Sequence, residues 1–72
     1  MEENDLIAKV HFNMGKVYQS QDEWIKASEQ YRMSLRIKND DYKSMVNLAI
    51  VLEKLAKHEE AVELLLKASL IR

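Results

Sequence analysis

The fold is decided by the stretch HFNMGKVY at residues 11–18, whose pattern returns as MVNLAIVL at residues 45–52. In both copies a large side chain is followed three positions on by an apolar residue, and a small residue comes directly after that. An aromatic residue or leucine stands three positions further on. Twelve positions past each small residue comes an alanine, Ala27 or Ala61. The chain is therefore an internal repeat.

This pattern resembles the tetratricopeptide repeat, a 34-residue motif of a large residue, Leu-Gly, Tyr and then Ala-x-x-x-Phe. Tyr31 and Leu65 stand at the last of these positions. The two copies cover residues 8–41 and 42–72, so a single domain over residues 1–72 is expected. The resemblance implies an all-α fold of four helices, arranged as two tandem antiparallel helix-turn-helix hairpins like a fragment of an α-solenoid.

Five positions depart from the family pattern. His11 and Met45 stand where the family favours tryptophan, and Asn39 stands where it favours a closing proline. Asp22 and Ala56 occupy the position of the family's loop glycine. The resemblance therefore depends on the class of side chain at each position more than on residue identity.

Helix is interrupted only by short polar clusters, because the chain has one glycine and no proline. The first helix is expected over about residues 5–20, with Asn4 or Asp5 as its cap. Its predicted inner face is formed by Ile7, His11, Met14, Gly15 and Tyr18.

The second helix begins after a Ser20/Glu23 capping box or an Asp22 cap, and it ends near Lys38. The run Asn39-Asp40-Asp41 then ends that helix and caps the third, which reaches about Leu55. The third helix is expected to turn Met45, Leu48, Ala49 and Leu52 inward. The fourth covers roughly residues 58–72.

Small residues are expected where the helices of a hairpin approach most closely. Gly15 would face Ala27, and Ala49 would face Ala61. A glycine inside a helix costs about 1 kcal/mol relative to alanine, so Gly15 needs a close neighbour as its reason.

Composition limits the possible functions. The net charge is −1 and 32% of the residues are charged, which is ordinary for a water-exposed surface. A nucleic-acid-binding protein would be expected to carry an excess of positive charge. No apolar run approaches membrane-spanning or signal-peptide length, so a cytoplasmic, water-soluble protein is expected. A core of this size is marginal, and without cysteine neither disulfides nor thiolate metal sites can strengthen it.

No constellation for catalysis, cofactor or metal binding stands out. His11 and His58 have no partner ligand at metal-binding spacing, and we expect a partly packed histidine and one at a helix start. Trp24 is expected to anchor the core. Without a glycine-rich phosphate loop or a serine elbow, no enzymatic activity is expected.

The expected function is protein–protein interaction through the concave surface lined by the first and third helices. In proteins that this chain resembles, that surface holds extended peptides, and an asparagine matching Asn13 and Asn47 bonds the peptide backbone. The predicted peptide-binding residues are Lys9, Phe12, Asn13, Lys16, Lys43, Val46, Asn47, Ile50 and Lys54. The lysines favour an acidic partner. The alternative is that these lysines are simply solvated and the asparagines make local hydrogen bonds.

A second interaction surface is predicted on the fourth helix. Leu64, Leu66 and Leu70 replace the Gln30, Arg32 and Arg36 of the first copy. Uncovered leucines predict a homo-oligomer or further repeats, because repeat arrays need polar caps. The competing function is therefore a structural, self-assembling unit.

Some members of the family that this chain resembles clamp the C-terminal carboxylate of chaperones, but only Asn47 matches that clamp.

Overall fold

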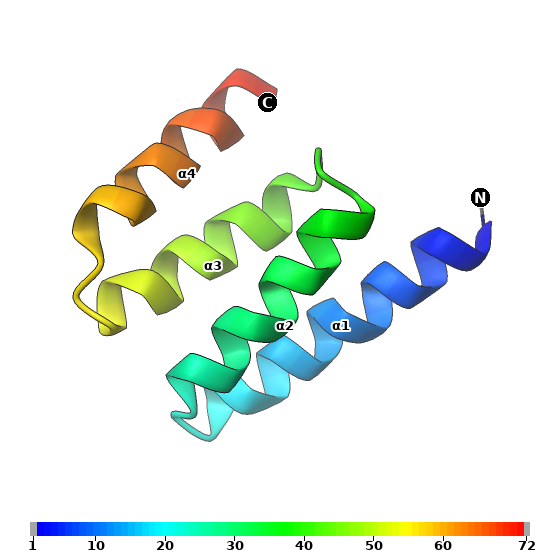
Figure 1. Cartoon of the computed structure of the whole chain (residues 1–72), viewed down its shortest axis with the longest axis horizontal. Helices are drawn as coiled ribbons and strands as arrows, with labels where there is room; N and C mark the ends of the chain where they lie inside the picture. Colours follow the sequence, from blue (N-terminus) through cyan, green and yellow to red (C-terminus); the bar gives the residue numbers. More distant parts are fainter. Residues whose placement is uncertain (1, 72) are drawn as a thin grey trace.

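The computed structural model describes residues 2–71 and places in them four α-helices and no strand. The helices are α1 (Glu2–Ser20), α2 (Trp24–Ile37), α3 (Tyr42–Lys54) and α4 (His58–Ile71) (Figure 1). The all-α fold is confirmed. Arg72, the predicted end of the last helix, lies outside the described residues.

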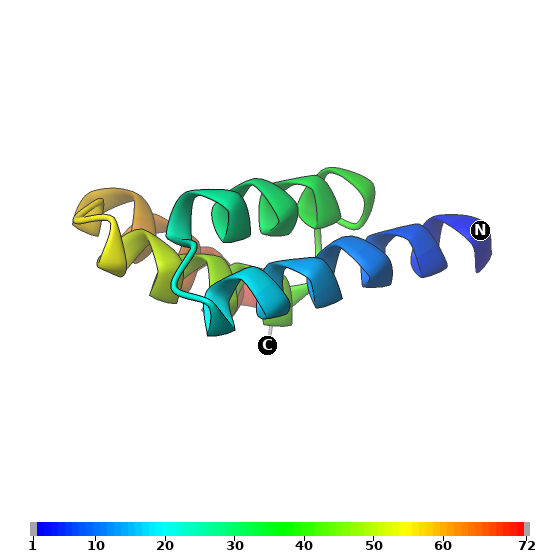
Figure 2. The ribbon, with the colours of Figure 1, turned by 90° about the horizontal axis from the view of Figure 1, so that it is seen from below.

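The helices form two hairpins that repeat with the predicted period. α1 and α3 end at equivalent positions of the repeat, Ser20 and Lys54, and α2 and α4 both begin and end at equivalent positions. α2 packs against α1 within the first hairpin and against α3 of the second (Figure 1). Seen from the side, α2 lies on one side of the layer that holds α1 and α3 (Figure 2).

Two predicted caps are wrong. α1 already begins at Glu2, so Asn4 and Asp5 lie within its first turns and do not cap it. The Ser20 hydroxyl donates to a carbonyl of its own helix, that of Val17, at 2.6 Å. Ser20 is the last residue of α1, and Glu23 stands at the N-cap of α2, so neither Ser20 nor Asp22 caps α2.

The N-cap of α2 is Glu23, whose side chain makes no capping hydrogen bond. The aspartate cap of α3 is confirmed: the Asp41 carboxylate accepts from the backbone N–H of Lys43 at 3.2 Å. The third helix starts where polar residues can satisfy its free amides.

The turn inside each hairpin contains one residue in the left-handed region. Asp22 has φ 60° and Ala56 has φ 62°, at equivalent positions of the repeat. A side chain in this region crowds the following carbonyl oxygen, which costs about 1–2 kcal/mol for most residues and nothing for glycine. Both turns are therefore strained at the position where the tetratricopeptide family uses glycine.

Ala56→Gly is expected to stabilise the protein by about 0.5–1 kcal/mol, because strain relief exceeds the added freedom of the unfolded chain. Thermal unfolding by circular dichroism measures this, with an expected rise of about 4 °C. Ala68→Gly, the same substitution inside α4, is the matched control and should lower the midpoint. A lower midpoint for Ala56→Gly would contradict the assignment of strain.

The core lies where the two hairpins meet. Met45, Leu48, Ala49 and Leu52 are buried, as predicted for the inner side of α3. The buried core cluster comprises Ala27, Tyr31, Leu48, Ala49, Val51, Leu52 and Ala61. The prediction for α1 was partly wrong: Ile7 and Met14 are exposed, because α1 packs mainly on one helix, α2.

Gly15 has the close neighbour that its presence requires, but the nearest atoms belong to Tyr31. A Cβ atom built on Gly15 would lie 2.6 Å from the Tyr31 Cε1 atom. The Tyr31 ring itself is fully buried. Glycine is therefore needed because three atoms of the Tyr31 ring lie within 3 Å of the place that a Cβ would occupy.

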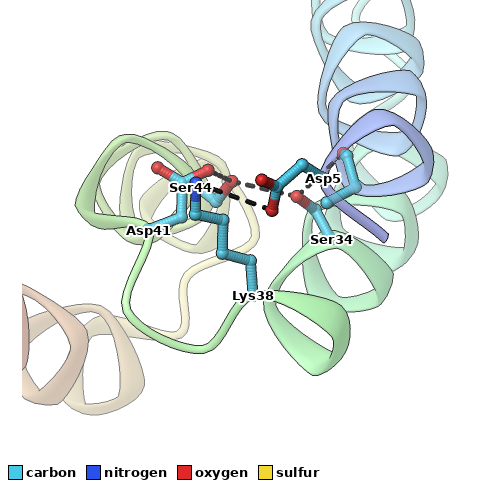
Figure 3. Close-up of polar contacts among 6 residues, drawn as sticks. Asp5, Ser34, Lys38, Asp41 and Ser44 are labelled. Carbon is cyan, nitrogen blue, oxygen red and sulfur yellow. Dashed lines mark hydrogen bonds and ion pairs between the residues drawn. The ribbon is translucent and has the colours of Figure 1, made fainter. Parts of the chain in front are cut away.

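A buried polar cluster joins three helices near the connection between the hairpins (Figure 3). The Ser34 hydroxyl donates to the Ala8 carbonyl at 3.0 Å, and its oxygen lies 3.2 Å from that of Ser44. Ser44 donates to Asp41 at 3.0 Å. Both serines are fully buried, so their hydrogen bonds avoid the cost of unpaired polar groups.

Candidate peptide-binding groove

Four of the predicted binding residues lie together. Lys9, Phe12 and Asn13 of α1 and Lys43 of α3 line a hollow of about 380 Å³ between the two helices. Lys38, Asp41 and Tyr42 complete its wall. The volume falls in the range of small ligand sites and suits one or two peptide side chains.

The hollow is positively charged. Three lysines (Lys9, Lys38 and Lys43) face one carboxylate, Asp41. That carboxylate already accepts hydrogen bonds from the Lys43 amide and the Ser44 hydroxyl. Lys38 also lies 3.9 Å from Asp5, but both side chains are largely solvated and such pairs are weak. The excess of lysines favours an anionic ligand.

Phe12 forms the apolar floor of the hollow. It is half-buried and tilted against Tyr31, with ring centroids 5.8 Å apart and an angle of 53° between the planes. The amine of Lys16 lies 5.7 Å from the Phe12 centroid, a cation–π distance. Lys16 therefore covers the ring and does not line the hollow.

The two asparagines have different surroundings, although they stand at equivalent positions. Asn13 is exposed at the hollow. Asn47 hydrogen-bonds the Tyr31 hydroxyl, which in turn donates to Gln19 Oε1 at 2.7 Å. Burial raises the pKa of Tyr31 above its ordinary value of 10.0, and the Asn47 bond opposes this shift. Asn47 thus supports the core, whereas the Asn13 amide can reach a ligand.

The remaining predicted residues lie away from the hollow. Val46 is half-buried and Ile50 is exposed on α3. The Lys54 amine lies 5.6 Å from the centroid of Trp24, a half-buried ring that packs on the core. This contact links the C-terminal end of α3 with the start of α2.

Sequence reasoning missed Lys38, Asp41 and Tyr42 as lining residues. All three lie in or next to the Asn39-Asp40-Asp41 break, outside the residues predicted for the groove. The chain reversal carries them to α1, next to Lys9. Only their position in or beside the predicted connection between the second and third helices could have indicated that they line the groove.

The predicted leucine surface of α4 is smaller than expected. Leu66 and Leu70 are exposed, but Leu64 is half-buried and packs against the core. Leu64 shares a second hollow with Leu48 and Leu35. It points between the helices and therefore does not belong to an exposed association surface.

Each histidine contacts one polar side chain. His11 lies 2.7 Å from Gln30 Oε1 and is half-buried, as predicted. His58, at the start of α4, lies 3.0 Å from Glu53 Oε2. Within residues 2–71, no three His, Asp or Glu side chains gather as metal ligands would.

No protein-family model matches the chain, and no curated protein does either. None of the four described helices is long and apolar enough to cross a membrane.

Proposed function

We propose that this protein is a non-enzymatic, tetratricopeptide-like interaction module that binds an acidic peptide segment in the hollow between α1 and α3. One observation carries the proposal. Lysines from α1, the interhelical connection and α3 converge on an apolar floor beside an exposed amide. A carboxylate, either a side chain or a chain terminus, would meet the lysines, and an apolar side chain would lie on Phe12.

The Asn13 amide offers both a donor and an acceptor to a peptide main chain. The hollow is small, so affinity is expected to be weak, and added salt should weaken it further by screening the lysines.

The test is titration of the ¹⁵N-labelled protein with an eight-residue peptide that carries four glutamates and one leucine. We expect the largest amide shifts at Lys9, Phe12, Asn13 and Lys43. A peptide with glutamine in place of every glutamate should cause little change. A C-terminally amidated version shows whether the terminal carboxylate contributes.

Charge reversal gives the matched comparison. Lys9→Glu with Lys43→Glu is expected to weaken binding about tenfold, since each exposed charge contact contributes up to about 1 kcal/mol. Lys57→Glu together with Lys67→Glu makes the same charge change away from the hollow. Equal loss in both double variants would show that only net charge matters, and the proposed groove would then be wrong.

A further inference from the structure

The side of α3 that packs on α2 is a single stripe along the helix. Ser44, Leu48 and Val51 are at most 1% exposed and follow one another at steps of four and three residues. The Ser44 hydroxyl lies 3.2 Å from Ser34 of α2, and Leu48 shares a hollow with Arg32 of α2. This stripe is the α3 half of the contact between the hairpins, here called the internal joint.

The same stripe is present on α1, but nothing covers it. Val10, Met14 and Val17 hold the corresponding positions in the first copy of the repeat and are 49%, 39% and 55% exposed. We call these three residues the front face. Together with Asn13, Tyr18 and Gln21 they line a hollow of about 430 Å³. Apolar side chains are thus retained where the first hairpin has no neighbour among the described residues.

The α2 half of the internal joint also has an uncovered equivalent. Tyr31 hydrogen-bonds Asn47 of α3, and Arg32 and Arg36 line the same hollow as Leu48. Their equivalents on α4 are Leu65, Leu66 and Leu70, here called the rear face. Tyr31 is fully buried, whereas Leu65 is 46% exposed. The rear face thus repeats the α2 surface with leucine in place of tyrosine and both arginines.

Charge explains one of these replacements. In the internal joint, Arg32 pairs with Glu60 of α4 at 2.7 Å. The residue equivalent to Glu60 in the first copy of the repeat is Lys26. An arginine at position 66 would therefore meet a lysine if a rear face joined a front face, and Leu66 removes that repulsion.

The buried serines are replaced in the same way. Ser34 and Ser44 touch in the internal joint, and their equivalents are Ala68 and Val10. Alanine against valine needs no hydrogen bond. Val10 against Ser34 would deprive a buried hydroxyl of a neighbouring polar group. The two terminal surfaces thus match each other better than either matches a half of the internal joint.

We propose that the rear face of one copy packs on the front face of the next, repeating the internal joint head to tail. Such a contact joins two different surfaces and leaves one of each free, so copies add to an open chain. The groove lysines Lys9, Lys38 and Lys43 belong to neither face, but Asn13 lines both the groove and the hollow at the front face.

Sedimentation of two complementary variants tests the proposal. Val10→Lys with Val17→Lys blocks the front face, and Leu66→Arg with Leu70→Arg blocks the rear face. All four side chains are exposed, so helix content should be unchanged by circular dichroism. The parent chain should grow past the dimer with concentration. Each variant alone should be monomeric, and an equal mixture should form one species of twice 8.5 kDa.

Other results would overturn the proposal. If the front-blocked variant alone remained a dimer, the rear faces would be pairing with each other. A mixture that stayed monomeric would show that the two faces do not meet. A parent chain that stayed monomeric at millimolar concentration would exclude self-association through either face.

Cross-linking gives a second measurement that does not depend on blocked faces. The chain has no cysteine, so Val10→Cys and Ala68→Cys, made in separate chains, introduce single thiols at the equivalents of Ser44 and Ser34. Ala68 is 5% exposed in the single chain, so reaction with a small thiol reagent must first show that its thiol is accessible. On oxidation, a mixture should form the mixed disulfide at least about tenfold faster than either chain links to itself, because the serine oxygens they replace are 3.2 Å apart. Lys57→Cys is the control partner. Equal rates with Lys57→Cys and Ala68→Cys would contradict the head-to-tail contact.

Discussion

Ala27→Leu is expected to lower the unfolding midpoint by about 10 °C or more. Ala27 is fully buried in the core cluster, on the side of α2 that faces the other helices. Three extra carbons there must displace packed neighbours, which costs about 1–3 kcal/mol. That is a large part of the roughly 4–11 kcal/mol expected for a domain of this length.

Thermal and urea unfolding measure this loss, with two companion variants. Glu29→Leu adds the same side chain to the exposed side of α2 and should change stability little. Ala61→Leu makes the equivalent change in α4, where the alanine is 1% exposed, and should be about as harmful. A midpoint for Ala27→Leu within 2 °C of the Glu29→Leu midpoint would mean that α2 does not pack as described.

Gly15→Ala is expected to destabilise the protein although alanine is the better helix former. The substitution gains about 1 kcal/mol in helix propensity, but its Cβ would lie 2.6–2.9 Å from three Tyr31 ring atoms. The ring cannot easily move, because Phe12 lies against it and its hydroxyl donates to Gln19. Overpacking costs about 1–3 kcal/mol, so a net loss of about 1 kcal/mol is expected.

The second hairpin supplies the design of the control. There Ala49 stands at the position of Gly15, and Leu65 stands at the position of Tyr31. The second hairpin therefore combines alanine with a side chain smaller than tyrosine. Ala49→Gly should also destabilise, by about 1–2 kcal/mol, through lower helix propensity and the loss of a buried methyl group. In a Tyr31→Leu background, Gly15→Ala should become neutral or stabilising, a coupling that a double-mutant cycle measures. Additive effects in that cycle would contradict direct contact between the two residues.

The candidate groove shows where local pattern stops being informative. Periodicity predicted that Lys9, Asn13 and Lys43 share one surface, and the three residues do line one hollow, because the direction of a side chain follows from its position along the helix. It treated Asn13 and Asn47 as equivalent. In the folded protein, α2 places Tyr31 against Asn47, and nothing among the described residues does the same for Asn13.

The sequence by itself determined the period of the repeat, the four helices and the identity of the closely packed positions. These features follow from interactions between residues three or four apart, and the repeat presents the same pattern twice. Helix starts were less certain, because Asn4, Asp5 and Ser20 are all good capping residues and only hydrogen bonds select among them.

Only the tertiary structure decided which apolar side chains are covered. Val17 and Val51 occupy equivalent positions in the repeat and are the same residue type, yet one is 55% exposed and the other fully buried. Their exposure depends on whether another hairpin packs beside the helix, and α2 does so for α3 but not for the front face of α1. Likewise, Lys38 reaches the groove only because the chain reverses between α2 and α3. Burial is a property of neighbours distant in sequence, and no local pattern contains it.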